Sequence, residues 1–210
     1  MLYNFIAIEG TIGAGKTTLA TRLAEDFNGK LILENFEDND FLPKFYQDQD
    51  KYAFPLEMSF MAARFQQLKD CLMNFDLFHS FFVADYFIVK SLIFAKKTLA
   101  EDEYQLFSRF FGLINTNIPK PDLLVYLYLN IDRLQENIKK RGRLYEQNIG
   151  DDYLEKIQTG YFEFFRQNSD MRILIIDTNN IDFVKSDNDY KKLINVINRP
   201  YEIGVHRIAF

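Results

Sequence analysis

The sequence has few of the residues that form cross-links or metal centres. Its 210 residues include one cysteine, two histidines and no tryptophan. The single thiol of Cys71 excludes an internal disulfide, and neither His79 nor His206 has cysteines at the spacing of a zinc site. The start of the chain also lacks the basic and then apolar order of a secretory signal. These absences favour a cytoplasmic protein without a zinc site.

Glycine and proline are scarce as well, at nine and five residues, and they are scattered along the chain. No low-complexity tract or internal repeat interrupts the sequence, and no apolar run approaches the ~20 residues that span a bilayer. Acidic residues outnumber basic ones by 30 to 25, which argues against a nucleic acid polymer as partner because its phosphates need a basic surface. We therefore expect one α/β domain over residues 1–210 and no membrane partner.

Strand and helix patterns alternate along the chain. Strands are expected at residues 3–10, 30–34, 81–85, 122–130 and 172–177, and helices at residues 16–27, 54–73, 86–99, 102–117, 133–141, 151–167 and 187–198. Asp132 is the expected N-cap of the helix 133–141. This order predicts a central parallel sheet of about five strands flanked by helices. Residues 199–210 give no pattern that we can interpret.

The stretch "GTIGAGKT", residues 10–17, fits the P-loop pattern G-x-x-x-x-G-K-[ST] between an expected strand and an expected helix. Glycines at these positions let backbone N–H groups face a phosphate chain at the positive end of a helix. Lys16 would reach the β- and γ-phosphates, and the hydroxyl of Thr17 would hold Mg²⁺. The expected nucleotide-binding residues are Gly10, Gly13, Ala14, Gly15, Lys16, Thr17 and Thr18.

Three acids end expected strands, Glu9, Glu34 and Asp85. In an open parallel sheet the second substrate lies beyond the carboxyl ends of the strands, beside the phosphate loop. Glu34 could accept the proton of a substrate hydroxyl that attacks a γ-phosphate, or it could be a solvated strand end. Asp85 could hold Mg²⁺ or its water, or it could cap the next helix.

A cluster of basic residues, "KKRGRLYEQ" at residues 139–147, follows the helix 133–141. One interpretation is that these charges complement the helix dipole. The other is an arginine-rich lid, in which Arg141 and Arg143 fold over the phosphates about a hinge at Gly142 and neutralise transition-state charge.

With these motifs the chain resembles the deoxynucleoside kinase family, particularly the bacterial deoxyguanosine and deoxyadenosine kinases. The resemblance covers about residues 3–177 and rests on "FIAIEGTIGAGKTTLA", "NDFLPKFYQDQDKYAFPLEMSFMAARFQQL", "VADYFIVKSLIFAKKTL", "PKPDLLVYL" and "KKRGRLYE". It implies a P-loop kinase fold, ATP and Mg²⁺ as cofactors, and a homodimer. It also implies that Glu34 is the base for the sugar 5′-hydroxyl and that Tyr46 and Glu146 hold the 3′-hydroxyl.

The resemblance also places Glu57 where many members have a glutamine that reads the base edge. Arg64 lies two turns further along the same helix face and would point into the same pocket. The alternatives are a half-buried aromatic side chain at Tyr46 and a solvated pair of Glu57 and Arg64. A carboxylate favours hydrogen-bond donors, and guanine offers two of them side by side, so deoxyguanosine is favoured over deoxyadenosine unless Arg64 neutralises Glu57.

The chain departs from the family at one place. Most members carry an acid-Arg-Ser triplet after the third strand, whereas this chain has Asp85, Tyr86 and Phe87. The bacterial deoxyguanosine kinases look similar here, with a lysine following. We hypothesise that Lys90 replaces the arginine, because a helix from residue 86 would put Tyr86 and Lys90 on one face.

The sequence therefore predicts an enzyme that moves the γ-phosphoryl group of ATP to the 5′-hydroxyl of a purine deoxynucleoside in nucleotide salvage. Two alternatives remain open. The first is another small P-loop kinase, such as a nucleoside monophosphate kinase. The second is a catalytically weak nucleotide-binding subunit, in which Tyr86 has replaced a required arginine.

Overall fold

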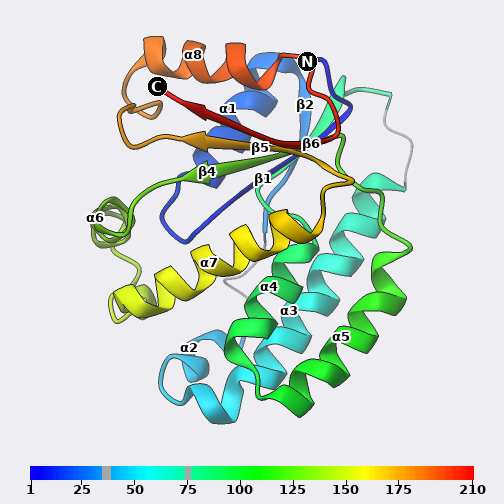
Figure 1. Cartoon of the computed structure of the whole chain (residues 1–210), viewed down its shortest axis with the longest axis vertical. Helices are drawn as coiled ribbons and strands as arrows, with labels where there is room; N and C mark the ends of the chain where they lie inside the picture. The colour runs from blue at the N-terminus through cyan, green and yellow to red at the C-terminus, as the bar shows by residue number, and fades with distance from the viewer. Residues whose placement is uncertain (35–38, 74–76) are drawn as a thin grey trace.

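Six parallel strands form the centre of the fold in a computed structural model of the chain, which describes residues 1–34, 39–73 and 77–210 (Figure 1). The strands are β1 (Phe5–Gly10), β2 (Gly29–Ile32), β3 (Phe81–Ala84), β4 (Leu123–Tyr128), β5 (Arg172–Asp177) and β6 (Gly204–Ala209). Their order across the sheet is β2-β3-β1-β4-β5-β6. The predicted parallel sheet is confirmed, with one strand more than the five expected. The additional strand, β6, lies in the tail that the sequence left uninterpreted.

The helices cover both faces of this sheet. They are α1 (Lys16–Phe27), α2 (Leu42–Phe45), α3 (Gln49–Leu72), α4 (Val89–Thr98), α5 (Glu101–Asn115), α6 (Ile131–Arg141), the 3₁₀ turn η1 (Leu144–Glu146), α7 (Asp151–Gln167) and α8 (Asp187–Ile197). Helices α1 and α8 lie on one face, and α3, α4, α5 and α7 form a thicker layer on the other (Figure 1). The sheet therefore separates two apolar cores.

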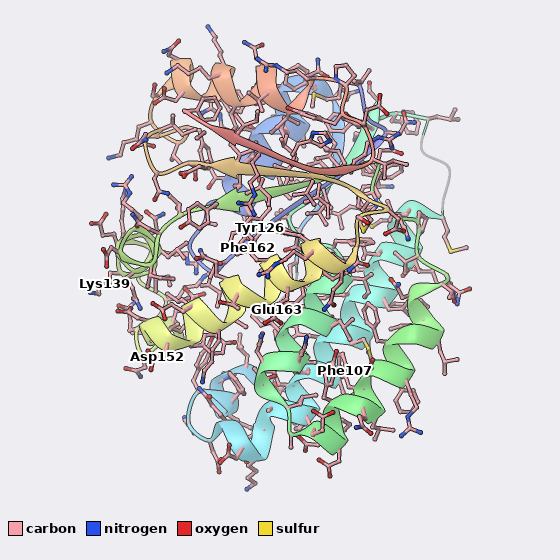
Figure 2. The ribbon with its side chains drawn as sticks, in the orientation of Figure 1. Phe107, Tyr126, Lys139, Asp152, Phe162 and Glu163 are labelled. Atoms are coloured by element: carbon pink, nitrogen blue, oxygen red, sulfur yellow. The ribbon has the colours of Figure 1, made fainter. Side chains whose placement is uncertain are left out.

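Each core is built from one set of strand side chains and the helices above it. On the α1 and α8 side, Leu19 and Leu193 pack with Ile8 of β1. On the opposite side, Phe107 of α5 and Phe165 of α7 belong to the second core, and Figure 2 shows Phe107 within the helical layer. Burial on both faces explains why β4 is an almost continuous apolar run.

The topology places the carboxyl ends of β1 and β3 beside each other at the point where the chain changes direction across the sheet. Strand β1 pairs with β3 on one side and with β4 on the other. Connections from neighbouring strands diverge at such a position and leave a crevice at the carboxyl edge. The phosphate loop follows β1, and Asp85 follows β3, so both lie at this crevice.

Several local predictions were wrong at their boundaries. Helix α3 begins at Gln49, five residues before the predicted start at residue 54. Strand β2 ends at Ile32, so Glu34 lies in the segment after the strand. Helix α4 begins at Val89 rather than at residue 86. The N-cap of α6 is Asn130 and not Asp132, because the Asn130 side chain accepts a hydrogen bond from the backbone N–H of Arg133 at 2.9 Å. In the part of the chain that is described, no helix combines the length and apolarity that crossing a membrane requires.

The capping of α6 gives a direct test of this correction. We expect Asn130→Ala to lower the free energy of unfolding by about 1 kcal/mol, because the N–H of Arg133 loses its acceptor. Asp132→Ala is the matched control, and it should cost less because Asp132 contributes only through the helix dipole. Urea denaturation of the three proteins measures both values. A larger loss for Asp132→Ala would contradict the assignment.

Candidate functional site

The phosphate loop between β1 and α1 has the backbone that its glycines predict. Gly13 and Gly15 both have a φ of 88°, a left-handed conformation that favours glycine. Space is equally restrictive, since a Cβ atom on Gly13 would lie 2.8 Å from the carbonyl oxygen of Leu134, and one on Gly15 would lie 2.8 Å from the ring of Phe183. These two glycines therefore allow close packing as well as the tight turn.

Lys16 closes the loop from the first turn of α1. Its ammonium group donates hydrogen bonds to the carbonyl oxygens of Gly10 and Thr11, at 2.9 and 3.2 Å. Burial and the positive charge of Lys90 together lower the pKa of Lys16 to about 8, against the opposing charges of Glu9 and Asp85. An anionic ligand in the loop would restore the ordinary pKa.

Asp85 connects the phosphate loop with the segment that carries Glu34. Its Oδ2 accepts a hydrogen bond from the hydroxyl of Thr17 at 2.6 Å, and its Oδ1 accepts one from the backbone N–H of Glu34 at 2.8 Å. The carboxylate therefore does not cap the following helix. A hydroxyl oxygen and a carboxylate oxygen side by side are ligands that Mg²⁺ prefers, so Thr17 and Asp85 are suited to holding this ion.

Glu34 lies between two cations. Arg64 of α3 donates from Nε to Oε1 at 2.7 Å, and Lys90 of α4 donates to Oε2. Only about a tenth of the Glu34 side chain is exposed. Burial by itself would raise the pKa of Glu34, but Arg64 and Lys90 outweigh it and hold the pKa well below its usual range. The carboxylate is therefore ionised at every pH at which the protein would work.

Tyr86 does not point toward this carboxylate. Its side chain is fully buried, and its hydroxyl donates to Oε1 of Gln67, whose amide donates to the carbonyl oxygen of Leu33 at 2.9 Å. Because α4 begins at Val89, the idea that Tyr86 and Lys90 share a helix face is wrong. Lys90 nevertheless reaches Glu34, directly from the first turn of α4.

Glu57 and Arg64 are both buried on α3, at 3% and 4% exposure, so the alternative of a solvated pair is wrong. Arg64 is engaged elsewhere: it forms a salt bridge from Nη2 to Glu34 and donates a hydrogen bond from Nη1 to the hydroxyl of Ser91 at 2.7 Å, and its guanidinium lies 4.8 Å from the ring centre of Phe60. Oε1 of Glu57 faces the hydroxyl of Thr98 at 3.1 Å. Burial raises the pKa of Glu57 to about 7, against the opposing charge of Arg64.

The predicted lid follows the end of α6. Gly142 has a φ of 75° and separates Arg141, the last residue of the helix, from Arg143. Both guanidinium groups contact the buried carboxylate of Glu146: Arg141 donates to Oε2, and Nη1 of Arg143 lies 3.4 Å from Oε1. The arginines therefore reach back toward the crevice and do more than complement the helix dipole.

One cavity brings these predicted residues together. Its lining includes Lys16, Thr17, Glu34, Tyr46, Glu57, Arg64, Asp85, Lys90, Arg141, Arg143 and Glu146. Apolar walls come from Leu56, Phe60 and Phe94, and Tyr153 of α7 contributes a further aromatic ring. Thr18, in contrast, is exposed on α1 and does not line the cavity.

Sequence reasoning named Glu9 among the three strand-end acids but gave it no role, and it missed Ser91 and Thr98. Glu9 is fully buried, and it accepts hydrogen bonds from the backbone N–H of Phe87 and the hydroxyl of Tyr161, each at 2.7 Å. Burial raises the pKa of Glu9. An acid inside an apolar strand was the available signal. No signal in the sequence pointed to Ser91 or Thr98. Their roles depend on the fold, which brings Arg64 against Ser91 and Glu57 against Thr98.

An aromatic layer supports the loop from below. The hydroxyl groups of Thr11 and Tyr126 lie 3.2 Å apart, and the ring of Tyr126 packs edge-on against Phe162 of α7 at 5.8 Å (Figure 2). On the other side, the amide of Asn137 on α6 donates to the carbonyl oxygen of Gly13 at 2.8 Å. Packing and hydrogen bonds thus fix the loop from both sides.

Comparison with known proteins gives consistent matches. A family model described as deoxynucleoside kinase matches residues 6–200. A deoxyguanosine kinase of Bacillus subtilis is 37% identical over 193 residues, which cover 90% of this chain and 93% of that protein. A deoxyadenosine kinase of Dictyostelium discoideum is 32% identical, covering 94% and 79%. The structure of a deoxyadenosine kinase from M. mycoides with bound dCTP superimposes with a TM-score of 0.79 at 26% identity, covering 92% and 98%.

Proposed function

Because the chain belongs to the deoxynucleoside kinase family, we propose that it transfers the γ-phosphoryl group of ATP to the 5′-hydroxyl of a purine deoxynucleoside. The observation that carries the proposal is that Lys16 of the phosphate loop and the carboxylate of Glu34 line one cavity. A triphosphate on the loop and a nucleoside on Glu34 would meet there. Such an enzyme works where ATP is abundant, which fits a cytoplasmic location.

The loop binds the donor through its backbone. The N–H groups from Gly13 to Thr17 and the start of α1 would hold the β- and γ-phosphates, with Lys16 moving from the loop carbonyls onto the phosphate oxygens. Thr17 and Asp85 would hold Mg²⁺, which neutralises charge on the phosphate oxygens.

Glu34 positions the acceptor. A carboxylate that stays ionised accepts the hydrogen of the sugar 5′-hydroxyl and points the oxygen at the γ-phosphorus. Phosphoryl transfer needs little early proton removal, since its transition state is loose, so a weakly basic carboxylate is sufficient. Tyr46 and Glu146, which line the same cavity, would hold the 3′-hydroxyl.

The cations around Glu34 and Glu146 would neutralise the charge that develops during transfer. Lys90 and the lid arginines Arg141 and Arg143 all line the cavity and already contact carboxylates. A phosphate group in the cavity offers these cations stronger partners, because it carries more charge than a carboxylate. Catalysis would thus come from positioning and charge stabilisation.

The base would lie against α3. Arg64 is paired with Glu34 and hydrogen-bonded to Ser91, so it does not form a salt bridge with Glu57 among the described residues. This supports Glu57 as an acceptor for the two adjacent donors of guanine, and deoxyguanosine as the preferred substrate ahead of deoxyadenosine. The Bacillus subtilis and Dictyostelium discoideum relatives compared above are named for deoxyguanosine and deoxyadenosine, respectively.

The proposed enzyme is also a homodimer. Helix α5 lies at the outside of the helical layer in Figure 1, and Leu106, Phe110 and Leu113 form an exposed apolar stripe on it. We expect the mass of two chains in sedimentation equilibrium, and the mass of one chain for Phe110→Glu. Ile203→Glu, at another exposed apolar position, is the control and should stay dimeric. A monomeric wild-type protein would remove this part of the proposal.

A substrate panel tests the reaction. With ATP and Mg²⁺, we expect phosphorylation of deoxyguanosine first and deoxyadenosine second, and slower turnover of the pyrimidine deoxynucleosides and of the ribonucleosides, measured as monophosphate by chromatography. Glu34→Gln should lower kcat about 10²-fold or more, because the hydroxyl loses its charged acceptor. Its thermal unfolding checks that the variant folds. Phosphorylation of nucleoside monophosphates instead would support the alternative kinase, and binding of deoxynucleosides without turnover would support the nucleotide-binding subunit.

The role of Lys90 has its own test. Lys90→Ala should lower kcat about 10²-fold or more, because a cation beside the reacting oxygens is lost. Removing Lys90 leaves Arg64 as the cation beside Glu34 and so raises the pKa of Glu34. As the pH is lowered, kcat of the variant should therefore begin to fall at a higher pH than kcat of the wild type. Lys96→Ala is the matched control, on the exposed side of the same helix. Wild-type turnover by Lys90→Ala would exclude the replacement of the family arginine by this lysine.

A further inference from the structure

Glu57 is a buried acid of the cavity, and its carboxylate forms no salt bridge among the residues that the structure describes. It lines the cavity from α3, with Leu56 and Phe60 on the same helix and Phe94 on α4. Among the described residues it has no salt bridge, whereas Glu34 has two and Glu146 has two. Its hydrogen-bonding partner is the neutral hydroxyl of Thr98. Burial without a counter-ion favours the neutral form of an acid.

The hydrogen bonds at Thr98 suit both protonation states of Glu57. Oγ1 of Thr98 lies 3.1 Å from Oε1 of Glu57 and 3.0 Å from the carbonyl oxygen of Phe94. A hydroxyl has a single hydrogen and donates to one acceptor at a time. When Glu57 is ionised, Thr98 donates to it. When Glu57 is protonated, Thr98 can donate to Phe94 and accept from the acid, so neither state leaves Thr98 without a partner.

The charged and titratable groups around Glu57 come from four parts of the fold. Arg64 lies on the same helix, Lys90 on α4, and Glu34 after β2, while Tyr153 faces it from α7. Tyr46, Arg141, Arg143 and Glu146 line the same cavity. Arg64 and Lys90 favour the carboxylate form, and burial and Glu34 favour the protonated form. These influences oppose one another and leave the pKa of Glu57 at about 7.

The two forms of this side chain complement different bases. A carboxylate only accepts hydrogen bonds, which matches N1–H and the 2-amino group of guanine. A protonated carboxyl group donates one hydrogen bond and accepts another, as a glutamine amide does. This matches adenine, which offers a ring nitrogen acceptor beside its 6-amino group. A site that leaves a buried polar group unpaired rejects that substrate strongly.

We propose that the protonation state of Glu57 selects the purine, with the carboxylate binding deoxyguanosine and the protonated acid binding deoxyadenosine. The proposal rests on the function proposed above, because it assumes that the base lies against α3. Selectivity between the two purines would then follow the pH of the medium, and the chain would phosphorylate both nucleosides at neutral pH. Neither base changes its own charge near neutrality, so the change in selectivity belongs to the protein.

A competition assay isolates this effect. Equal concentrations of deoxyguanosine and deoxyadenosine are incubated in one tube with ATP and Mg²⁺, and both monophosphates are measured at early times between about pH 6 and about pH 8. The product ratio equals the ratio of the two kcat/KM values. Titration of Lys16, Glu34 or ATP changes the rates of both reactions by the same factor, so it does not change the product ratio. We expect the ratio of dGMP to dAMP to rise about tenfold or more over this interval.

Three variants complete the test. Glu57→Gln has one donor and one acceptor at every pH, so its ratio should favour dAMP and stay constant. Thr98→Val removes a hydrogen bond that is stronger to the charged carboxylate than to the neutral acid, so the midpoint of the ratio should move to higher pH. Glu155→Gln makes the same change at an exposed position on α7 and should behave as the wild type.

The possible results separate the two proposals. If the wild-type ratio does not change with pH while both nucleosides are phosphorylated, the selection by Glu57 is wrong and the kinase function stands. The same holds if Glu57→Gln keeps a pH-dependent ratio. If the wild-type protein phosphorylates neither nucleoside, the proposed function fails, and the selection by Glu57 fails with it.

Discussion

The two hydrogen bonds accepted by Asp85 determine how far the phosphate loop lies from the candidate proton acceptor. One carboxylate oxygen binds the hydroxyl of Thr17 at the start of α1, and the other binds the backbone N–H of Glu34. Asp85 itself follows β3, which pairs with both β1 and β2. The position of the phosphate loop relative to Glu34 is therefore set by the pairing of the strands in the sheet. Loops alone would hold them far less accurately.

Four of the cations that line the cavity contact carboxylates. Arg64 and Lys90 contact Glu34, and the two lid arginines contact Glu146. Burying unpaired charges of one sign so close together would be costly, and each acid reduces that cost. The same acids are the residues proposed to hold the sugar hydroxyls. Stability without substrate and recognition of the sugar therefore depend on the same few side chains.

Much of this fold and site could be predicted because the signals are local. The phosphate loop is specified by glycines that the backbone requires, and the six residues of β4 are apolar because both faces of the sheet are covered. Helix α7 was predicted with the bounds that it has, since its apolar residues recur with helical spacing. The resemblance to known kinases then supplied the residues from distant segments that line the cavity.

The remainder depends on contacts that one segment does not reveal. Strand β6 alternates between half-buried and exposed residues at the edge of the sheet, so it lacks the apolar run of a central strand. Asn130 rather than Asp132 caps α6 because the helix begins two residues earlier than its sequence pattern suggests. The direction of Tyr86 depends on Gln67, nineteen positions before it. Sequence periodicity carries no information about such a partner.

The hydrogen bonds that connect Tyr86 through Gln67 to Leu33 restrict which substitutions are compatible with one another at this site. The hydroxyl of Tyr86 binds Gln67, which in turn binds the carbonyl oxygen of Leu33, next to Glu34. Exchanging this tyrosine for the arginine of the family pattern would remove the hydrogen bond to Gln67. It would also bury a further cation while Lys90 is still present. Exchanging the lysine first would leave Glu34 with one cation. Either single exchange would disturb the surroundings of Glu34, so we expect a functional change at one of these two positions to require a change at the other.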